Sequence, residues 1–264
     1  MIGFIGSGNM AQAMFGGMII GGYSASEITV TGTNAQKLAE KQKKFGVKVT
    51  TDNREAALAD IVILAVKPYQ FASVIAEIKD VVKEETIVIS VAAGITLAQM
   101  SDMFGRDLKL VRTMPNTPSL VGEGMAAIVP SALVTATDLE KVQAIFDSFG
   151  KSQIVTEEAL HGVIAVAGSS PAYVYMFIEA LADGAVLQGI PRAQAYEFAS
   201  QAILGAAKMV LETGQHPGAL KDAVCSPKGT TIEAVIQLEK SGFRQSVLQA
   251  MAVCADKSRE MSKG

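Results

Sequence analysis

The first eleven residues of the chain have the pattern of a strand, a glycine turn and the start of a helix. The apolar run at 2–5 predicts a buried strand, and a helix is expected from Met10 onward. Between them, Gly6, Gly8 and Ala11 match the pattern G-x-G-x-x-A, which is typical of dinucleotide-binding turns. The first glycine permits a tight turn, the second lets the backbone approach a pyrophosphate, and the alanine lets the helix pack close to the sheet. This end of the chain is therefore predicted to be a nucleotide-binding βαβ unit.

The start of the predicted helix is itself suited to an anion. Helix N-termini carry unpaired N–H groups and the positive end of the helix dipole, both of which favour phosphate. We therefore expect the cofactor pyrophosphate to bind along the whole turn, which comprises Gly6, Ser7, Gly8, Asn9, Met10 and Ala11.

The segment after the second predicted strand indicates which dinucleotide binds. NAD-binding domains usually place an acidic side chain about 20 residues beyond the glycines, where it binds the ribose 2′-hydroxyl. This chain has Thr33 and Asn34 there, followed by Lys37. Short neutral donors and a lysine suit a 2′-phosphate better, so NADP(H) is the predicted cofactor and NAD(H) the alternative. A solvent-exposed Lys37 with no ligand is the competing interpretation.

Strands and helices alternate through the first part of the chain. Further strands are predicted at 27–31, 46–50, 61–66, 86–91, 108–113, 125–129 and 153–155, and helices at 35–44, 71–82, 97–103 and 136–149. This alternation predicts the α/β class, with an N-terminal Rossmann-type, doubly wound parallel sheet. Because ligands bind at the carboxyl ends of such strands, the turns at 6–10, 67–68, 93–94 and 114–116 are expected to line one cleft.

Apolar helices dominate the rest of the chain, with segments predicted at 160–166, 172–187, 192–213, 220–224, 232–240 and 246–261. We predict two domains, an NADP(H)-binding Rossmann domain over 1–156 and an all-helical domain over 157–264. Helices this apolar are hard to bury within so short a segment of one chain. A homo-oligomer that shares the helical core between subunits is therefore expected.

Composition excludes several classes of partner. A net charge of −3 argues against nucleic acid or an anionic membrane as the main partner. The two cysteines, Cys225 and Cys254, form neither a disulfide framework nor a metal-ligand pattern, so we expect no metal and a reducing cytoplasm. No uninterrupted apolar run reaches the ~18 residues of a membrane span. Because the first strand is predicted directly after Met1, we expect no signal peptide.

Four further motifs resemble those of the pyrroline-5-carboxylate reductase family. They are SVAAG at 90–94, RTMPNTP at 112–118, GSSPAY at 168–173 and SPKGTTI at 226–232. The resemblance extends from Gly3 to Cys254. It implies NAD(P)H-dependent reduction of 1-pyrroline-5-carboxylate to L-proline by a Rossmann domain followed by a helical dimerisation domain. It also implies a homodimer, with a higher assembly such as a decamer left open.

The resemblance further implies roles for individual residues. Thr33, Asn34 and Asn53 would lie near the adenosine, with the riboses and nicotinamide contacted by Ala65, Val66, Lys67, Pro68, Ala92, Ala93 and Gly94, and with Met114, Pro115 and Asn116 beside the ring. The substrate would bind at Ser226, Gly229, Thr230 and Thr231, with Thr231 closest to the imine. Lys228 and Ser170 depart from the family, which often has glycine at both positions. A lysine at 228 must adopt whatever backbone angle that turn requires.

The segment 226–232 also suggests an anion site without reference to the family. Ser226 is extended because it precedes a proline, and the residues after Gly229 predict a helix. Its first N–H groups would suit a carboxylate. The cofactor carries the hydride, so the protein has mainly to position the reactants. A hydroxyl at Thr231 would orient the imine nitrogen and assist proton delivery. The competing interpretation is a plain helix cap.

Two other functions fit the same layout. A β-hydroxyacid dehydrogenase would need a basic residue on a helix of the second domain, and only Lys208, outside any motif, lies deep in that region. A non-catalytic NADP(H) sensor would use the helical domain for assembly alone. His161 and His216 fall outside the motifs and are interpreted as structural, and Glu157 with Glu158 as a helix start.

Overall fold

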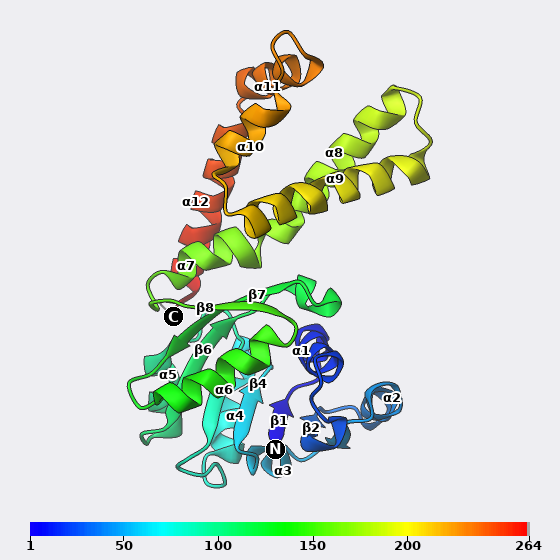
Figure 1. The fold of residues 1–264 in the computed structure, drawn as a ribbon. Coiled ribbons are helices and arrows are strands. Elements are labelled where there is room, and N and C mark those ends of the chain that lie inside the picture. Colours follow the sequence, from blue (N-terminus) through cyan, green and yellow to red (C-terminus); the bar gives the residue numbers. More distant parts are fainter. Residues whose placement is uncertain (263–264) are drawn as a thin grey trace. The chain divides into compact units, whose positions relative to one another are not determined.

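The computed structural model describes residues 1–262 and divides into two compact units (Figure 1). One unit is Met1–Ser169 together with the segment from Cys254 onward, and the other is Ser170–Val253. The first unit thus extends past residue 156 and includes the end of the last helix. The division of the chain into domains at 156 and 157 stays a prediction.

The first unit is built on one eight-stranded sheet with the strand order β3-β2-β1-β4-β5-β6-β7-β8. Its strands are β1 (Ile2–Ile5), β2 (Ile28–Thr31), β3 (Lys48–Thr50), β4 (Ile61–Leu64), β5 (Ile87–Ser90), β6 (Lys109–Met114), β7 (Gly124–Pro130) and β8 (Gly150–Ile154). From β1 the chain first adds β2 and β3 on one side of the sheet, and it then returns to add β4 on the other side of β1. In doubly wound sheets, such a reversal forms the crevice at the carboxyl ends of the strands where nucleotides bind.

The predicted parallel, doubly wound sheet is confirmed, and one pair of neighbouring strands in it is antiparallel. Strand β7 runs antiparallel to β6, with Thr113 opposite Ile128, whereas β7 and β8 are parallel again. Only the short 3₁₀ helix η3 (Thr117–Val121) lies between β6 and β7. A parallel neighbour needs a crossover connection of about a dozen residues or more, so this short segment turns the chain back instead.

Helices cover both faces of the sheet (Figure 1). They are α1 (Asn9–Ile20), α2 (Ala35–Phe45), α3 (Asn53–Ala57), α4 (Phe71–Ile78), α5 (Leu97–Phe104) and α6 (Ala136–Asp147), with short 3₁₀ turns η1 (Ala25–Glu27) and η2 (Pro68–Gln70). Neighbouring strand residues face opposite sides: Phe4 packs in the core under α1 and α6, whereas Ile5 packs in the core under α4 and α5. The helix α3 was not predicted, because it has little more than one turn.

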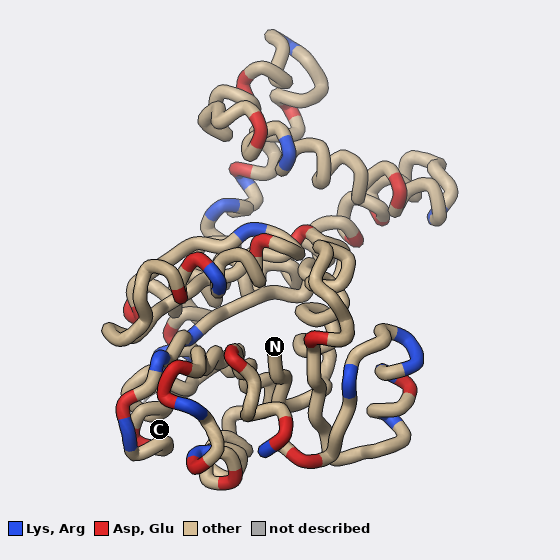
Figure 2. Tube along the Cα trace, turned by 60° about the horizontal axis from the view of Figure 1, so that its bottom comes forward, with Lys and Arg blue, Asp and Glu red and all other residues tan. Residues whose placement is uncertain are grey.

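The second unit is helical, as predicted. It contains α8 (Ser170–Leu187), α9 (Arg192–Thr213), α10 (Pro217–Val224), α11 (Thr230–Lys240) and the first part of α12 (Phe243–Ser262). The preceding α7 (Leu160–Val163) continues into a π-helical turn, Ile164–Gly168, instead of the regular helix expected over 160–166. Figure 2 shows that uncharged residues predominate along α8 and α9.

Large apolar side chains remain exposed on these helices in the single chain, among them Tyr175, Met176, Leu187, Phe198, Met209, Leu211 and Leu248. Within residues 1–262, one helical stretch, Leu160–Leu187, is long and apolar enough to cross a membrane by length and composition alone. Only 11% of its most apolar window is buried inside the chain. A helix that packs against a partner subunit passes the same test, so this stretch is weak evidence for a membrane span.

Candidate active site

The glycine turn at the end of β1 can be formed only with glycine at position 6. Gly6 has a φ of +104°, a left-handed angle that L side chains rarely adopt. A Cβ atom there would also lie 2.5 Å from the carbonyl oxygen of Ala65, at the end of the neighbouring strand. Ala65 in turn donates its N–H to Ile5 at 2.8 Å. The predicted residues Gly6 and Ala65 therefore pack backbone against backbone at the crevice.

The start of α1 has the open geometry that an anion needs. Gly8 is the N-cap, with no side-chain capping hydrogen bond, and a Cβ added to it would meet no atom within 4 Å. Asn9 is exposed and Met10 half-buried, whereas Ala11 is fully buried against the sheet. The first-turn N–H groups consequently face a space that no side chain of the cap fills.

A series of side-chain hydrogen bonds supports the glycine turn. The N–H of Gly6 donates to Thr31 Oγ1 at 3.3 Å, and the Thr31 hydroxyl donates to Asn53 Oδ1 at 2.6 Å. Asn53 Nδ2 then donates to Glu77 Oε2 at 2.8 Å. Asn53 was predicted to lie near the adenosine, and its amide has a protein partner at both polar atoms. Thr31 and Glu77 were missed, because their roles depend on contacts between distant segments.

The predicted adenosine-end residues follow β2. Gly32 lies against the glycine turn, since a Cβ there would stand 2.7 Å from Ser7 Oγ. Thr33, Asn34 and Lys37 are all exposed. Asn34 caps α2 by accepting the Lys37 N–H at 2.9 Å, and the Lys37 ammonium forms no ion pair within residues 1–262. A cation in the first turn of a helix is unfavourable without a nearby anion.

The turns after β4, β5 and β6 lie at the same edge, because these strands are parallel neighbours. The turn after β4 contains Val66, Lys67 and Pro68, and Lys67 donates its N–H to Gln70 at 3.2 Å. The turn after β5 contains Ala92, Ala93 and Gly94, and Gly94 is buried with a φ of +86°. The predicted residues of three separate segments are thus brought together.

The turn after β6 is held by its asparagine. Asn116 is 7% exposed, its Nδ2 donates to the Ala167 carbonyl at 3.0 Å, and its Oδ1 accepts the Met125 N–H at 2.9 Å. Pro115 is buried and Met114 half-buried. Asn116 therefore fixes the position of the turn, and Met114 is the member of the three with the most accessible side chain.

The predicted substrate loop lies in the second unit, between α10 and α11. Gly229 donates its N–H to the Ser226 carbonyl at 3.0 Å, and a Cβ on Gly229 would collide with Ser226 Oγ. Gly229 is the N-cap of α11 and no side chain caps this helix, so the plain Ser/Thr cap does not occur. Thr230 is exposed and Thr231 half-buried. The first N–H groups of α11 are therefore available to an anion.

Lys228 in this loop has an unusual backbone. Its φ is +58°, and within residues 1–262 it is the only non-glycine residue with a positive φ. The left-handed region is unfavourable for residues with a Cβ. The glycine that is frequent in the family would adopt this angle without strain.

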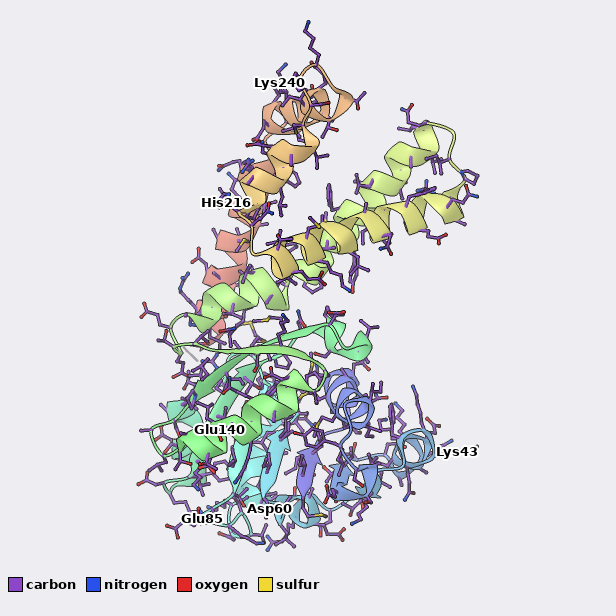
Figure 3. The ribbon with its side chains drawn as sticks, in the orientation of Figure 1. Lys43, Asp60, Glu85, Glu140, His216 and Lys240 are labelled. Carbon is purple, nitrogen blue, oxygen red and sulfur yellow. The ribbon has the colours of Figure 1, made fainter. Side chains whose placement is uncertain are left out.

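The two histidines have structural partners. His216 caps α10 by accepting the Gly218 N–H at its Nδ1, at 3.0 Å (Figure 3). His161 Nδ1 lies 2.9 Å from Ser258 Oγ in a hydrogen bond. Burial lowers the pKa of His161, and the positive charges of Arg112 and Arg259 lower it further. Both contacts agree with the structural interpretation.

Comparisons with known proteins divide the chain into two matching segments. Residues 1–94 match the family described as NADP oxidoreductase coenzyme F420-dependent. Residues 157–261 match the family described as pyrroline-5-carboxylate reductase dimerisation. A pyrroline-5-carboxylate reductase of Escherichia coli (strain K12) is 51% identical over 264 residues, covering 99% of this chain and 98% of that protein. One of Methanosarcina acetivorans is 41% identical with the same coverage.

Solved structures give the same match over the whole fold. A pyrroline-5-carboxylate reductase from Coxiella burnetii has a TM-score of 0.94 at 37% identity and covers 100% of this chain and 98% of its own. A Plasmodium falciparum pyrroline carboxylate reductase with NADP bound has a TM-score of 0.89 at 32% identity, covering 99% and 97%. A prephenate dehydrogenase from A. aeolicus, at 12% identity and a TM-score of 0.54, shares the fold alone.

Proposed function

The chain belongs to the pyrroline-5-carboxylate reductase family, and we propose that it transfers a hydride from NAD(P)H to the C=N bond of 1-pyrroline-5-carboxylate. The product is L-proline, and the reaction is the last step of proline biosynthesis. The observation that carries this proposal is 51% identity over 99% of the chain to a reductase of that name. The β-hydroxyacid dehydrogenase alternative has no comparable support.

The residues at the crevice fit a dinucleotide. The uncapped start of α1 and the open space beside Gly8 suit the pyrophosphate, which Gly6, Ser7 and the first N–H groups of α1 would hold. Asn34 and the unpaired Lys37 would hold the 2′-phosphate, which favours NADP(H) over NAD(H). The turns at 65–68, 92–94 and 114–116 would contact the riboses and the nicotinamide. When bound, the reduced nicotinamide supplies the hydride.

The loop before α11 would bind the substrate. The N–H groups of Thr230 and Thr231 and the loop residues Ser226 and Gly229 would hold the carboxylate at the positive end of the helix dipole. The Thr231 hydroxyl would hydrogen-bond the ring nitrogen, which orients the C=N bond and assists its protonation. No strong general acid is needed, because an imine is itself basic.

The helical region provides the assembly. Its match to the dimerisation family and the exposed apolar side chains of α8 and α9 support oligomerisation through these helices. We propose a homodimer as the basic unit, with a decamer as the higher assembly to be tested. A cytoplasmic location remains the prediction drawn from the free thiols of Cys225 and Cys254.

The deciding experiment follows the consumption or formation of NADPH by its absorbance with three kinds of substrate. Consumption with 1-pyrroline-5-carboxylate, and not with small oxo-acids, is the expected result. Oxidation of a β-hydroxyacid with NADP⁺ would instead favour the dehydrogenase. NADPH binding without turnover of any substrate would favour the sensor.

A further inference from the structure

A single carboxylate joins two segments beside the proposed nicotinamide site. Glu157 Oε1 accepts a hydrogen bond from Arg112 Nη1 at 2.9 Å and another from the backbone N–H of Leu97, also at 2.9 Å. Arg112 belongs to β6 and Leu97 is the first residue of α5. Glu157 therefore ties a strand end to a helix start, although it is 45 and 60 residues away from them in sequence.

Both tied segments lead directly to predicted cofactor contacts. Arg112 precedes Met114 by two residues in the same strand, and Leu97 follows the turn that ends at Gly94. The strands that carry these turns are parallel neighbours, with Ser90 opposite Arg112. Glu157 contacts both β6 and the start of α5. The separation between the turn that ends at Gly94 and the turn that follows Met114 therefore depends on this side chain.

The buried guanidinium of Arg112 depends on the Glu157 carboxylate as its partner. Arg112 is 1% exposed, and Glu157 is its only ion-pair partner within residues 1–262. The Nε and Nη2 atoms of Arg112 are buried without a described hydrogen-bond partner. Removal of the carboxylate would leave a buried charge with no partner, which is strongly unfavourable. We expect β6 and its following turn to shift in response.

Only the Arg112 side of this ion pair is buried, since the Glu157 side chain is 36% exposed. Even fully buried ion pairs often add little to stability in comparison with apolar side chains of similar volume. The contact does, however, constrain geometry. Two hydrogen bonds to one oxygen of Glu157 define the relative position of their donors, Arg112 Nη1 and the Leu97 N–H. We propose that Glu157 is a positioning residue for hydride transfer, which holds the turns at 92–94 and 114–116 at the separation that the nicotinamide requires. This inference rests on the proposed function for its catalytic consequence.

The test compares binding of whole NADPH with binding of adenosine 2′,5′-bisphosphate, a fragment that lacks the nicotinamide half. In Glu157→Ala we expect the Kd of NADPH to rise about tenfold and kcat to fall by ten- to a hundredfold, because small misplacements near the reacting atoms have effects of this size. The Kd of the fragment should stay within twofold. Glu157→Gln, which keeps an oxygen for Leu97 but loses the charge, should give an intermediate result.

Glu158→Ala is the matched control, since this neighbouring glutamate is exposed and has no ion pair or side-chain hydrogen bond within residues 1–262. Equal weakening of NADPH and the fragment, or no weakening of either, would overturn the inference. If Glu157→Ala does not fold, the same two constants for Glu157→Gln decide. Failure of the wild-type enzyme to reduce the cyclic imine would refute the proposed function separately, because the binding comparison needs no turnover.

Discussion

The hydroxyl of Thr31 donates a hydrogen bond of 2.6 Å to the Oδ1 atom of Asn53, behind the glycine turn. The hydroxyl oxygen of Thr31 also accepts the Gly6 N–H at 3.3 Å, and Thr31 is fully buried. The first glycine of the turn is therefore held by side chains from the next strand and from α3, in addition to its own backbone.

Replacement of Thr31 with valine tests this support. Thr31→Val keeps the shape of the side chain but removes the partner of both Gly6 and Asn53. We expect the Kd of NADPH to rise roughly tenfold, equivalent to about 1.4 kcal/mol, as measured by fluorescence titration. Thr29→Val, on the same strand and without a described side-chain hydrogen bond, is the control. Equal effects of the two variants would contradict the prediction.

The preference for NADPH should depend on Lys37. We expect Lys37→Gln to raise the KM for NADPH about tenfold and to leave the KM for NADH nearly unchanged, because only NADPH has a 2′-phosphate to pair with the ammonium. Lys43→Gln removes a charge from the last turn of the same helix (Figure 3) and should change neither value. A parallel rise for both cofactors would exclude a 2′-phosphate contact.

Thr231 is the residue on which the proposed chemistry depends. Thr231→Ala should lower kcat/KM for the cyclic imine by roughly 10²-fold, or about 2.7 kcal/mol, while Thr231→Ser retains most of the activity. Steady-state kinetics with saturating NADPH measures both variants. A loss smaller than threefold in the alanine variant would remove Thr231 from the mechanism.

Lys228 should limit the stability of its loop. Its φ of +58° is a conformation that costs a residue with a Cβ about 1–2 kcal/mol, whereas glycine adopts it freely. Lys228→Gly should stabilise the protein by about 0.5–1 kcal/mol after the larger entropy of unfolded glycine is subtracted, measured as a higher urea midpoint. Lys228→Ala keeps the strain and should give no gain. Equal midpoints for the two variants would contradict the role of backbone strain.

The free energy of unfolding should decrease at acidic pH because of His161. Its pKa is below the ordinary value of 6.5, chiefly because of burial and then because of Arg112 and Arg259. As the pH falls below about 6.5, His161 binds a proton in the unfolded chain more readily than in the folded chain, so the free energy of unfolding decreases. His161→Asn should make the urea midpoint depend less on pH between about pH 5 and pH 7. An unchanged slope in His161→Asn would refute the assignment.

The helices and strands that the sequence pattern located are those whose signals are local. The turn of Gly6 and Gly8 joins a strand to a helix within a dozen residues, and the apolar run of β4 needs no partner to be recognised. The family motifs likewise located the loop at Gly229. They also indicated that Lys228 stands where the family often has glycine, although its φ value is known only from the structure.

By itself, the sequence determined the α/β alternation, the nucleotide-binding turn and the helical second half, because these depend on spacing between residues close in the chain. Tertiary structure alone decided the reversed direction of β7, the hydrogen bonds from Gly6 through Thr31 to Asn53, and the carboxylate of Glu157 between Arg112 and Leu97. Each of these is a contact between segments far apart in sequence. Such contacts depend on strand order and side-chain packing, which the spacing of residues along one segment does not encode.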